Sequence, residues 1–240
     1  MSAPAIRLSA SKEWVAAEAL ARQFFLRKAR HRHYSVITES AHRRPPPLLF
    51  DNTRTALRAL IREFDAMLEE RHSEAEWHEF LRANPILLGA AGTIHSKPVF
   101  AYPAPHLRTG KLNIQPDFVI SYPDQSYDVI EIESPDAGMV RRDATPRRDF
   151  VQPSFQVGEF RSYIMDHAER LGIAFPGIRG NSAFKLIIGR DALLGATPEE
   201  ITAQKAMLRA THNIDRILTY DDLRRQAARM LHNLERLGQG

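Results

Sequence analysis

The chain contains no cysteine among its 240 residues, and it has no long apolar segment. A protein without cysteine forms no disulfide bond and no thiolate metal site, which is typical of the reducing cytoplasm. No apolar run approaches the roughly 18 to 20 residues that would cross a bilayer, and the N-terminus lacks the basic-then-apolar pattern of a signal peptide. We therefore expect a soluble, cytoplasmic protein that does not enter a membrane.

Several common catalytic signatures are also missing. The sequence has no glycine-rich P-loop, no GxSxG motif and no HExxH pair of histidines. It shows no internal repeat, and its one low-complexity stretch is the proline triplet at residues 45–47. These absences argue against a P-loop nucleotide hydrolase, a GxSxG-type serine hydrolase and a zinc protease.

The formal net charge is only +4, but basic residues are concentrated near the N-terminus. Residues 22–44 contain a single acid, Glu39, against seven basic residues: Arg22, Arg27, Lys28, Arg30, Arg32, Arg43 and Arg44. Such a block is typical of a surface that contacts a polyanion. A solvated helix face followed by a flexible tail explains the same block equally well.

The proline triplet separates two segments with helical spacing of apolar residues. Residues 12–30 precede it, and residues 53–72 follow it with one continuous apolar stripe. Three consecutive prolines supply no backbone donors, so a helix cannot run through them. We expect a helical N-terminal region over residues 1–72, which connects or oligomerises, followed by a second domain over residues 73–240.

The second region mixes helical and strand patterns. "SEAEWHEFLRANP" carries Ser73 and Glu76 at the spacing of a capping box, which predicts a helix that buries Trp77, Phe80 and Leu81. The runs "KPVFAYP", "IQPDFVISYP" and "YDVIEIE" predict an antiparallel meander of three strands. "AFKLIIGR" is typical of a strand buried on both faces, and helical patterns flank it. This order predicts an α/β fold with a mixed sheet.

Two of these predicted strands carry acids where a sheet interior would exclude them. Strict alternation in "DVIEIESP" puts Glu131 and Glu133 on one face of a strand, and Asp117 comes from the neighbouring strand. A buried carboxylate costs several kcal/mol unless it is paired or bound to a metal. A divalent cation would remove the mutual repulsion, and oxygen ligands suit Mg²⁺ or Mn²⁺. The alternative is a half-buried strand whose polar face happens to be acidic.

The pair "QPDFVI" and "DVIEIES" resembles the core motif of the PD-(D/E)xK nucleases. The wider sequence resembles the Shedu family of bacterial anti-phage nucleases, because six segments occur in the order typical of that family and together span residues 74–234. They are "AEWHEFLRANPILLG", "PDFVI", "VIEIESP", "FQVGEFRSYI", "FKLIIGR" and "ILTYDDLRRQAARML". The resemblance implies a restriction-endonuclease-like core, with a mixed central sheet flanked by helices and preceded by a helical N-terminal region.

The resemblance also assigns candidate site residues. Asp117 and Glu131 match the metal-binding acids, and Gln156 matches a glutamine that often completes such sites from the following helix. Glu76 lies in the opening helix, where these nucleases often supply another carboxylate, although its spacing from Ser73 equally fits a capping residue. Two further acids of this helix are candidates for the same role, Glu74 and Glu79.

The sequence departs from the family pattern at Glu133, which stands where the motif has a lysine. That lysine normally helps to activate the attacking water and stabilises charge on the phosphate. One interpretation is an active variant in which Glu133 serves as a base or as a ligand of a second metal. The other is a catalytically weakened nuclease fold that acts as a nucleic-acid-binding or scaffold module.

We therefore expect a Mg²⁺- or Mn²⁺-dependent endonuclease or nickase of double-stranded DNA, with Asp117, Glu131, Glu133, Gln156 and Glu76 at its catalytic site. The arginine-rich loop at residues 136–150 is expected to contact the DNA backbone, although its acids also allow it to pair with itself. The resemblance and the apolar surface of the N-terminal helices favour a homo-oligomer, a dimer or a tetramer, over helices docked within one chain.

Overall fold

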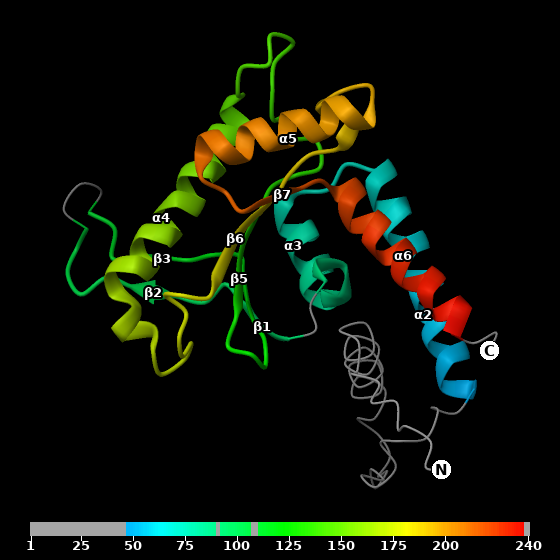
Figure 1. The fold of residues 1–240 in the computed structure, drawn as a ribbon, viewed down its shortest axis with the longest axis horizontal. Coiled ribbons are helices and arrows are strands. Elements are labelled where there is room, and N and C mark those ends of the chain that lie inside the picture. Colours follow the sequence, from blue (N-terminus) through cyan, green and yellow to red (C-terminus); the bar gives the residue numbers. More distant parts are fainter. Residues whose placement is uncertain (1–46, 90–91, 107–109, 238–240) are drawn as a thin grey trace, which may run out of the picture.

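The computed structural model describes residues 47–89, 92–106 and 110–237 (Figure 1). Helices and strands alternate along most of this range. In chain order they are α2 (Pro47–Glu69), α3 (Glu74–Ala83), η2 (Pro85–Leu88), β1 (Thr93–Ser96), β2 (Phe100–Ala101), β3 (Asn113–Ile114), β4 (Phe118–Ser121), β5 (Tyr127–Ile132), α4 (Arg148–Leu171), β6 (Ser182–Ile187), η3 (Asp191–Leu193), α5 (Pro198–His212), β7 (Arg216–Leu218) and α6 (Tyr220–Leu237).

The centre of the fold is a five-stranded mixed sheet in the order β1-β4-β5-β6-β7. The first three strands pair antiparallel, and β5, β6 and β7 pair parallel. Parallel neighbours need a long crossover, which α4 supplies between β5 and β6 and α5 supplies between β6 and β7. The predicted α/β fold with a mixed sheet flanked by helices is confirmed.

The predicted meander is correct in its second and third strands but wrong in its first. The strand that pairs with β4 is β1, residues Thr93–Ser96, whereas Phe100 and Ala101 of "KPVFAYP" form β2 and pair with β3 in a separate two-stranded sheet. Pro98 lies between β1 and β2 and cannot donate a ladder hydrogen bond. The more apolar run was therefore misassigned to the central sheet.

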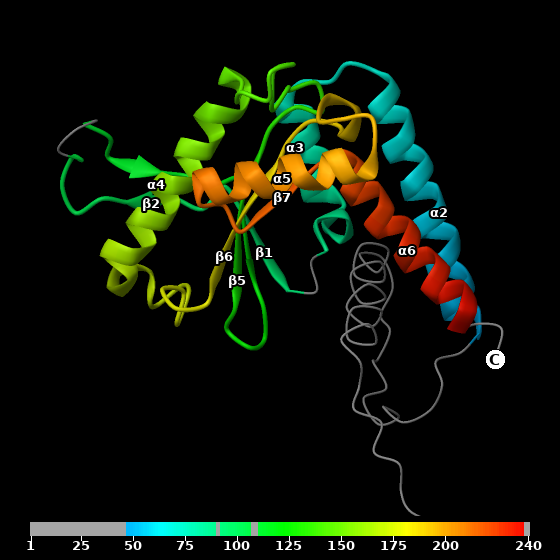
Figure 2. The same ribbon diagram turned by 45° about the horizontal axis from the view of Figure 1, so that its top comes forward.

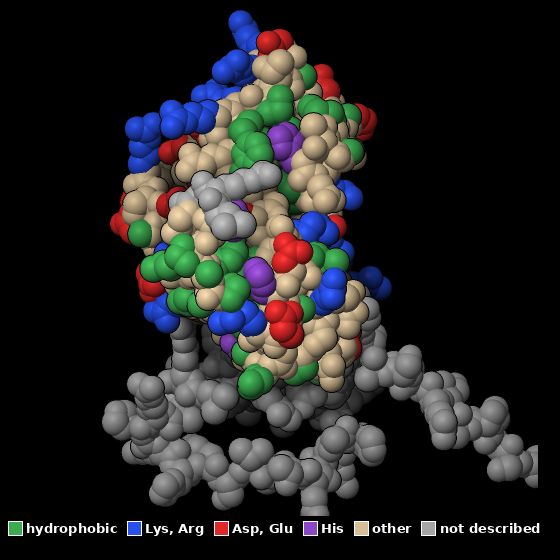
Figure 3. Space-filling model, turned by 90° about the vertical axis from the view of Figure 1, so that its left-hand side faces the viewer, with side chains coloured by type: hydrophobic (Ala, Val, Ile, Leu, Met, Phe, Trp, Pro, Cys, Tyr) green, Lys and Arg blue, Asp and Glu red, His purple; other side chains and the backbone are tan. Residues whose placement is uncertain are grey.

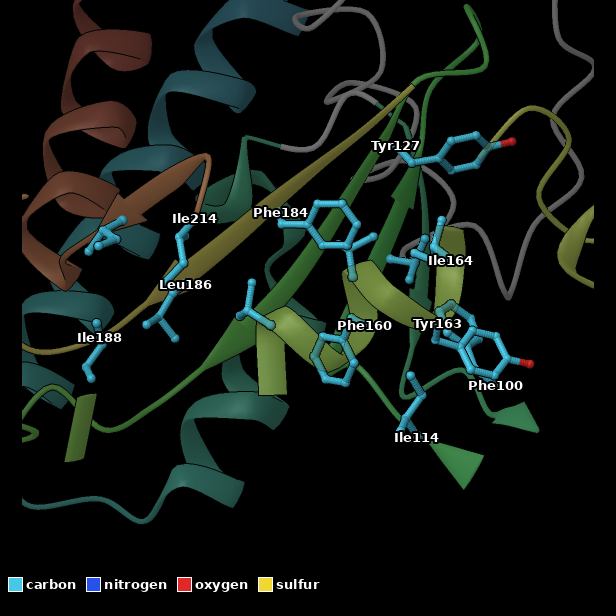
Figure 4. Close-up of a cluster of buried hydrophobic side chains, with 14 of the residues drawn as sticks. Phe100, Ile114, Tyr127, Phe160, Tyr163, Ile164, Phe184, Leu186, Ile188 and Ile214 are labelled. Carbon is cyan, nitrogen blue, oxygen red and sulfur yellow. The ribbon is translucent and has the colours of Figure 1, made fainter. Parts of the chain in front are cut away.

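Helix α4 covers one face of the sheet with a large apolar core (Figure 4). Val119 of β4, Val129 of β5 and Leu186 of β6 are fully buried on this side. Phe160 and Tyr163 of α4 pack against the same core. The alternation of buried residues along β4 and β5 assigns their odd-numbered positions to this face.

Helices α2, α3 and α6 cover the opposite face, where α2 and α6 lie side by side in both ribbon views (Figures 1 and 2). The ring of Trp77 in α3 packs edge-on against Tyr220 of α6, with centroids 4.6 Å apart. Phe64 of α2 contacts the same pair at 5.6 and 6.3 Å. The prediction that α3 buries Trp77, Phe80 and Leu81 is confirmed.

Helix α2 shares its core with residues beyond the domain boundary expected at 72 and 73. Leu57, Leu60 and Phe64 belong to one apolar cluster with Phe118 and Ile130 of the sheet. The apolar stripe of α2 is therefore packed within the chain, which is the arrangement that the oligomer prediction weighed as its rival. The basic block at 22–44 and the helix predicted at 12–30 lie outside the described residues. None of the helices within the described ranges is long and apolar enough to cross a membrane.

We predict that Phe64→Ala lowers the free energy of unfolding by about 3–5 kcal/mol, because it opens a cavity between α2, Trp77 and Tyr220. Urea denaturation followed by tryptophan fluorescence measures the change. Phe155→Ala is the matched control, since that ring is 73% exposed on α4, and its expected effect is within about 0.5 kcal/mol. Equal losses in the two variants would show that α2 is not part of the cooperative core.

Candidate active site

Asp117 and Glu131 face each other where β4 and β5 pair. Phe118 lies opposite Ile130, so the same antiparallel register puts Asp117 opposite Glu131. Asp117 is 7% exposed, and its Oδ2 accepts a hydrogen bond of 3.0 Å from the Ile132 backbone N–H. The carboxylate of Asp117 therefore satisfies a backbone donor at the point where the ladder between β4 and β5 ends.

Glu131 is buried as deeply as Asp117. It is 6% exposed, and its Oε2 atom is buried with no hydrogen-bond partner among the described residues. Burial, followed by the negative charges of Asp117, Glu133 and Glu74, raises the pKa of Glu131 to about 9. Without a counterion, this side chain is protonated at neutral pH.

Glu133 follows β5 and has its backbone fixed on both sides. Its N–H donates to the Ile187 carbonyl over 2.8 Å, and its carbonyl accepts from the Tyr220 hydroxyl over 2.8 Å. Burial and then the charges of neighbouring acids, with Glu74 first, raise the pKa of Glu133 to about 7. Its carboxyl group is less buried than that of Glu131 and changes protonation near neutral pH.

The opening helix contributes Glu74 to this acid group, whereas Glu76 forms the predicted capping box. Glu76 Oε2 accepts from the Ser73 N–H at 2.7 Å and from the Ser73 Oγ at 2.8 Å. Burial and the charge of Asp117 raise the pKa of Glu74, while the bonds to Ser73 lower that of Glu76. The capping box is thus confirmed. Glu74 is the acid of α3 whose pKa is raised by the charge of Asp117. We name Glu74, Asp117, Glu131 and Glu133 the acid cluster.

Two basic side chains border the acid cluster at Asp117. His78 of α3 stacks on Phe118 with ring centroids 4.6 Å apart, and its Nε2 lies 3.9 Å from Asp117 Oδ1. Lys97, directly after β1, places its Nζ 4.0 Å from the same oxygen. Burial raises the pKa of Asp117, and the Ile132 N–H and these two basic side chains oppose that rise. Neither His78 nor Lys97 was among the candidates from sequence, because each is placed by packing across strands.

Gln156 lies on α4 and lines a groove of about 810 Å³ that runs along α4 beside β2 and β3. None of the hydrogen bonds found among the described residues joins Gln156 to the acid cluster. Figure 3 views the molecule from the side of α4, β2 and β3, and Lys and Arg side chains gather toward its upper edge. That level corresponds to the loop between β5 and α4 in Figure 1.

The donor atoms of the acid cluster suit a hard divalent cation. Carboxylate oxygens are the ligands that Mg²⁺ and Mn²⁺ prefer, and the partnerless Oε2 of Glu131 is a buried acceptor that a cation would satisfy. Across the described residues, no three His, Asp or Glu side chains are already arranged to hold an ion. The residues fit such an ion by chemistry and charge, and Glu133 or Glu74 would have to approach Asp117 and Glu131 to complete the site.

The fold and this cluster define an α/β protein with buried carboxylates at the ends of two adjoining strands of a mixed sheet. The sequence profile of the family described as "Shedu protein SduA, C-terminal" matches residues 71–224. The chain belongs to this Shedu family, and membership suggests a role in anti-phage defence. No curated protein matches the sequence.

The raised pKa values predict how stability depends on pH in the absence of metal. An unfolded glutamate ionises near pH 4.3, whereas folded Glu133 and Glu131 hold their protons until about pH 7 and 9. The folded protein therefore binds more protons in this window, so the free energy of unfolding falls as pH rises from about 5 to 9. Thermal melts in a chelator across this range measure the slope.

Glu131→Gln should reduce this slope and raise the melting temperature at pH 8, because folding then no longer requires uptake of a proton at this position. At pH 8, which lies between the unfolded pKa near 4.3 and the folded pKa of about 9, about 1.4 kcal/mol per pKa unit and roughly 2–4 °C per kcal/mol predict a gain on the order of ten degrees. Glu76→Gln is the control, because it makes the same substitution at an exposed glutamate outside the acid cluster. This variant should keep the slope. A Glu131→Gln variant with the unaltered slope would contradict the burial of an ionisable Glu131.

Proposed function

We propose that this protein is a divalent-metal-dependent endonuclease or nickase of double-stranded DNA that acts in anti-phage defence. The observation that supports the proposal most strongly is the partnerless Oε2 of Glu131, buried opposite Asp117 at the end of two strands. Buried carboxylates that lack a partner are costly and mark functional sites. The placement of the pair also resembles the PD-(D/E)xK arrangement indicated by the sequence.

Asp117 and Glu131 are the residues that would hold Mg²⁺ or Mn²⁺, with Glu74 and Glu133 next to them. A bound divalent cation supplies a lowered pKa for the attacking water and offsets charge on the phosphate. Asp117 keeps Oδ2 on the Ile132 N–H and leaves Oδ1 toward His78 and Lys97. The strand backbone thereby fixes the direction of the second oxygen.

Glu133 is suited to accept a proton from the attacking water. Without a bound cation its pKa is about 7. A divalent cation nearby would lower that pKa, so the carboxylate would be ionised and able to accept a proton at neutral pH. The hydrogen bonds of its N–H to Ile187 and of its carbonyl to Tyr220 fix the backbone from which the carboxylate projects. With Glu133 as the base, an enzyme that has a glutamate in place of the motif's lysine could still activate the attacking water and remain active.

The arginine-rich loop between β5 and α4 is the proposed contact with the DNA backbone. Arg142 and Arg148 are exposed, and Arg148 lines the groove along α4. Arg147 lies 3.6 Å from Asp149, so part of the loop pairs with itself. The negative charge of Asp149 also raises the pKa of Glu133, because the start of α4 lies near the acid cluster. Guanidinium groups next to a metal site are well placed for flanking phosphates.

A second function is favoured by one observation. The described residues contain no preformed group of three ligands, which suits a nuclease fold that binds nucleic acid without cutting it. In that case the acid cluster would have only a structural role, and neither Mg²⁺ nor Mn²⁺ would change the melting temperature of the protein. Cation binding therefore separates the two functions before any cleavage is measured.

We predict that Mg²⁺ or Mn²⁺ both supports nicking of supercoiled plasmid and raises the melting temperature of the protein by several degrees at pH 8. Asp117→Asn and Glu131→Gln should abolish cleavage and the metal-dependent rise, because each removes a charged ligand. Glu79→Gln is the control on α3, where Glu79 pairs with Arg82 at 2.6 Å. Cleavage that survives chelator, or survives both site variants, would contradict the proposed site.

Glu133→Gln tests the role of the proposed base. A glutamine keeps the size of the side chain but cannot take a proton, so we predict a loss of cleavage of about 10²-fold or more, with DNA affinity nearly unchanged. The measurements are single-turnover nicking and fluorescence anisotropy. If the base were unnecessary, the variant would cut at the unaltered rate; if the site were inactive, Glu133→Lys would be the change expected to start cleavage.

A further inference from the structure

Lys97 occupies a distinctive backbone position at the edge of the acid cluster. It directly follows β1, and its N–H donates to the carbonyl of Asp117 over 2.8 Å. Its own carbonyl accepts from Nε2 of Gln115 over 2.7 Å. Both backbone polar groups of Lys97 are thus attached to the segment that carries Asp117, so the two residues keep a fixed relation.

The backbone of Lys97 is in the left-handed region, with φ of +47°. A residue with a Cβ atom pays about 1–2 kcal/mol for that conformation, and a glycine would avoid the cost. Strained backbone of this kind is enriched at active sites and ligand clamps, although Gln125, Ala144 and Asn213 also have a positive φ in this chain. The two hydrogen bonds to the Asp117 segment hold this conformation. The conformation in turn sets the direction in which the side chain leaves the backbone.

The side chain of Lys97 lies beside the acid cluster but forms only a loose ion pair with it. Its Nζ lies 4.0 Å from Asp117 Oδ1, at the outer limit of an ion pair, and 48% of the side chain is exposed. The ammonium group therefore retains donors for a ligand that approaches from solvent. The other basic side chain at Asp117, His78, is buried against Phe118 and cannot meet such a ligand.

No other described lysine offers this combination. Lys185 is buried and paired with Asp128, and Lys205 lies in a network with Asp191 and Asp222. Lys111 is as exposed as Lys97, at 47%, but it pairs with Glu159 at 2.6 Å. Lys97 is thus the lysine that combines exposure with a place beside the acid cluster.

We propose that Lys97 Nζ binds a phosphate of the nucleic-acid backbone at the acid cluster. This inference rests on the proposed function, since it names the residue that receives the phosphate. An anionic phosphate cannot approach four carboxylates unless cations offset the repulsion, and a positioned lysine is a common way to stabilise a reacting phosphate. Strand β5 itself brings only acids to this place, so the cation comes from the end of β1.

The test uses the full chain, a short fluorescently labelled DNA duplex and Ca²⁺ in place of Mg²⁺. Lys97→Gly removes the ammonium group and suits the left-handed backbone, so it should melt at or above the temperature of the unaltered protein. Lys97→Arg keeps the charge. Gln125→Gly is the backbone control, because Gln125 also has a positive φ, of 59°, in the turn between β4 and β5. Arg229→Met is the charge control, because Arg229 is exposed on α6, over the other face of the sheet.

We expect Lys97→Gly to weaken DNA binding and to reduce the slope of log affinity against log salt by about 0.9, the value for one lost phosphate contact. Lys97→Arg should restore most of the slope, and both controls should keep it. Under cleaving conditions, Lys97→Gly should lower the nicking rate by roughly 10²-fold or more. Calorimetry should find Mn²⁺ affinity equal or tighter, because a neighbouring cation has been removed.

The proposal is overturned if Lys97→Gly keeps the salt slope, or if Arg229→Met loses as much of it. It is also overturned if Lys97→Gly loses several degrees of melting temperature, which would indicate a structural role. These outcomes are distinct from failure of the proposed function. An unaltered protein that binds DNA through Lys97 but never cuts it would remove the nuclease activity and keep the phosphate contact. If the Lys97→Gly variant cut DNA at the unaltered rate, the nuclease activity would stand and the phosphate contact of Lys97 would be refuted.

Discussion

The opposed burial of Asp117 and Glu131 is the constraint on which the acid cluster depends. The antiparallel register of β4 and β5 brings the two carboxylates together, and the Ile132 N–H fixes one oxygen of Asp117. A sheet interior offers no water to solvate these charges, so the pKa of Glu131 rises to about 9. We propose that a divalent cation binds here, because it would satisfy the partnerless oxygen and remove the repulsion.

The helices on the second face of the sheet hold the surroundings of this pair in place. Trp77 and Tyr220 form the centre of that layer, and the hydroxyl of Tyr220 reaches through to the carbonyl of Glu133. The helix that contains Trp77 also presents Glu74 and His78 to the strands. One apolar layer therefore positions an acid, a histidine and the end of β5, which couples packing to the chemistry of the site.

The sequence was sufficient to predict features set by local pattern. Alternation in "DVIEIESP" placed Glu131 correctly on a buried strand next to Asp117, and the spacing of Ser73 and Glu76 predicted the observed capping box. It could not select Glu74, because two acids in one helical turn differ only in how the helix is rotated against the sheet. It could not find Lys97 either, since a positive φ and a contact across strands leave no local signal. The first strand was misassigned because apolar content does not determine which sheet a short strand joins.

Crystals grown with Mn²⁺ give the most direct test that the acid cluster is a cation site. An anomalous difference map locates the ion without reference to catalysis, and the account predicts a peak in contact with Asp117 Oδ1 and Glu131 Oε2. Glu131→Gln crystals grown in the same way should lose that peak. An acid cluster that stays without anomalous signal at saturating Mn²⁺, or a peak confined to surface carboxylates elsewhere, would contradict the account.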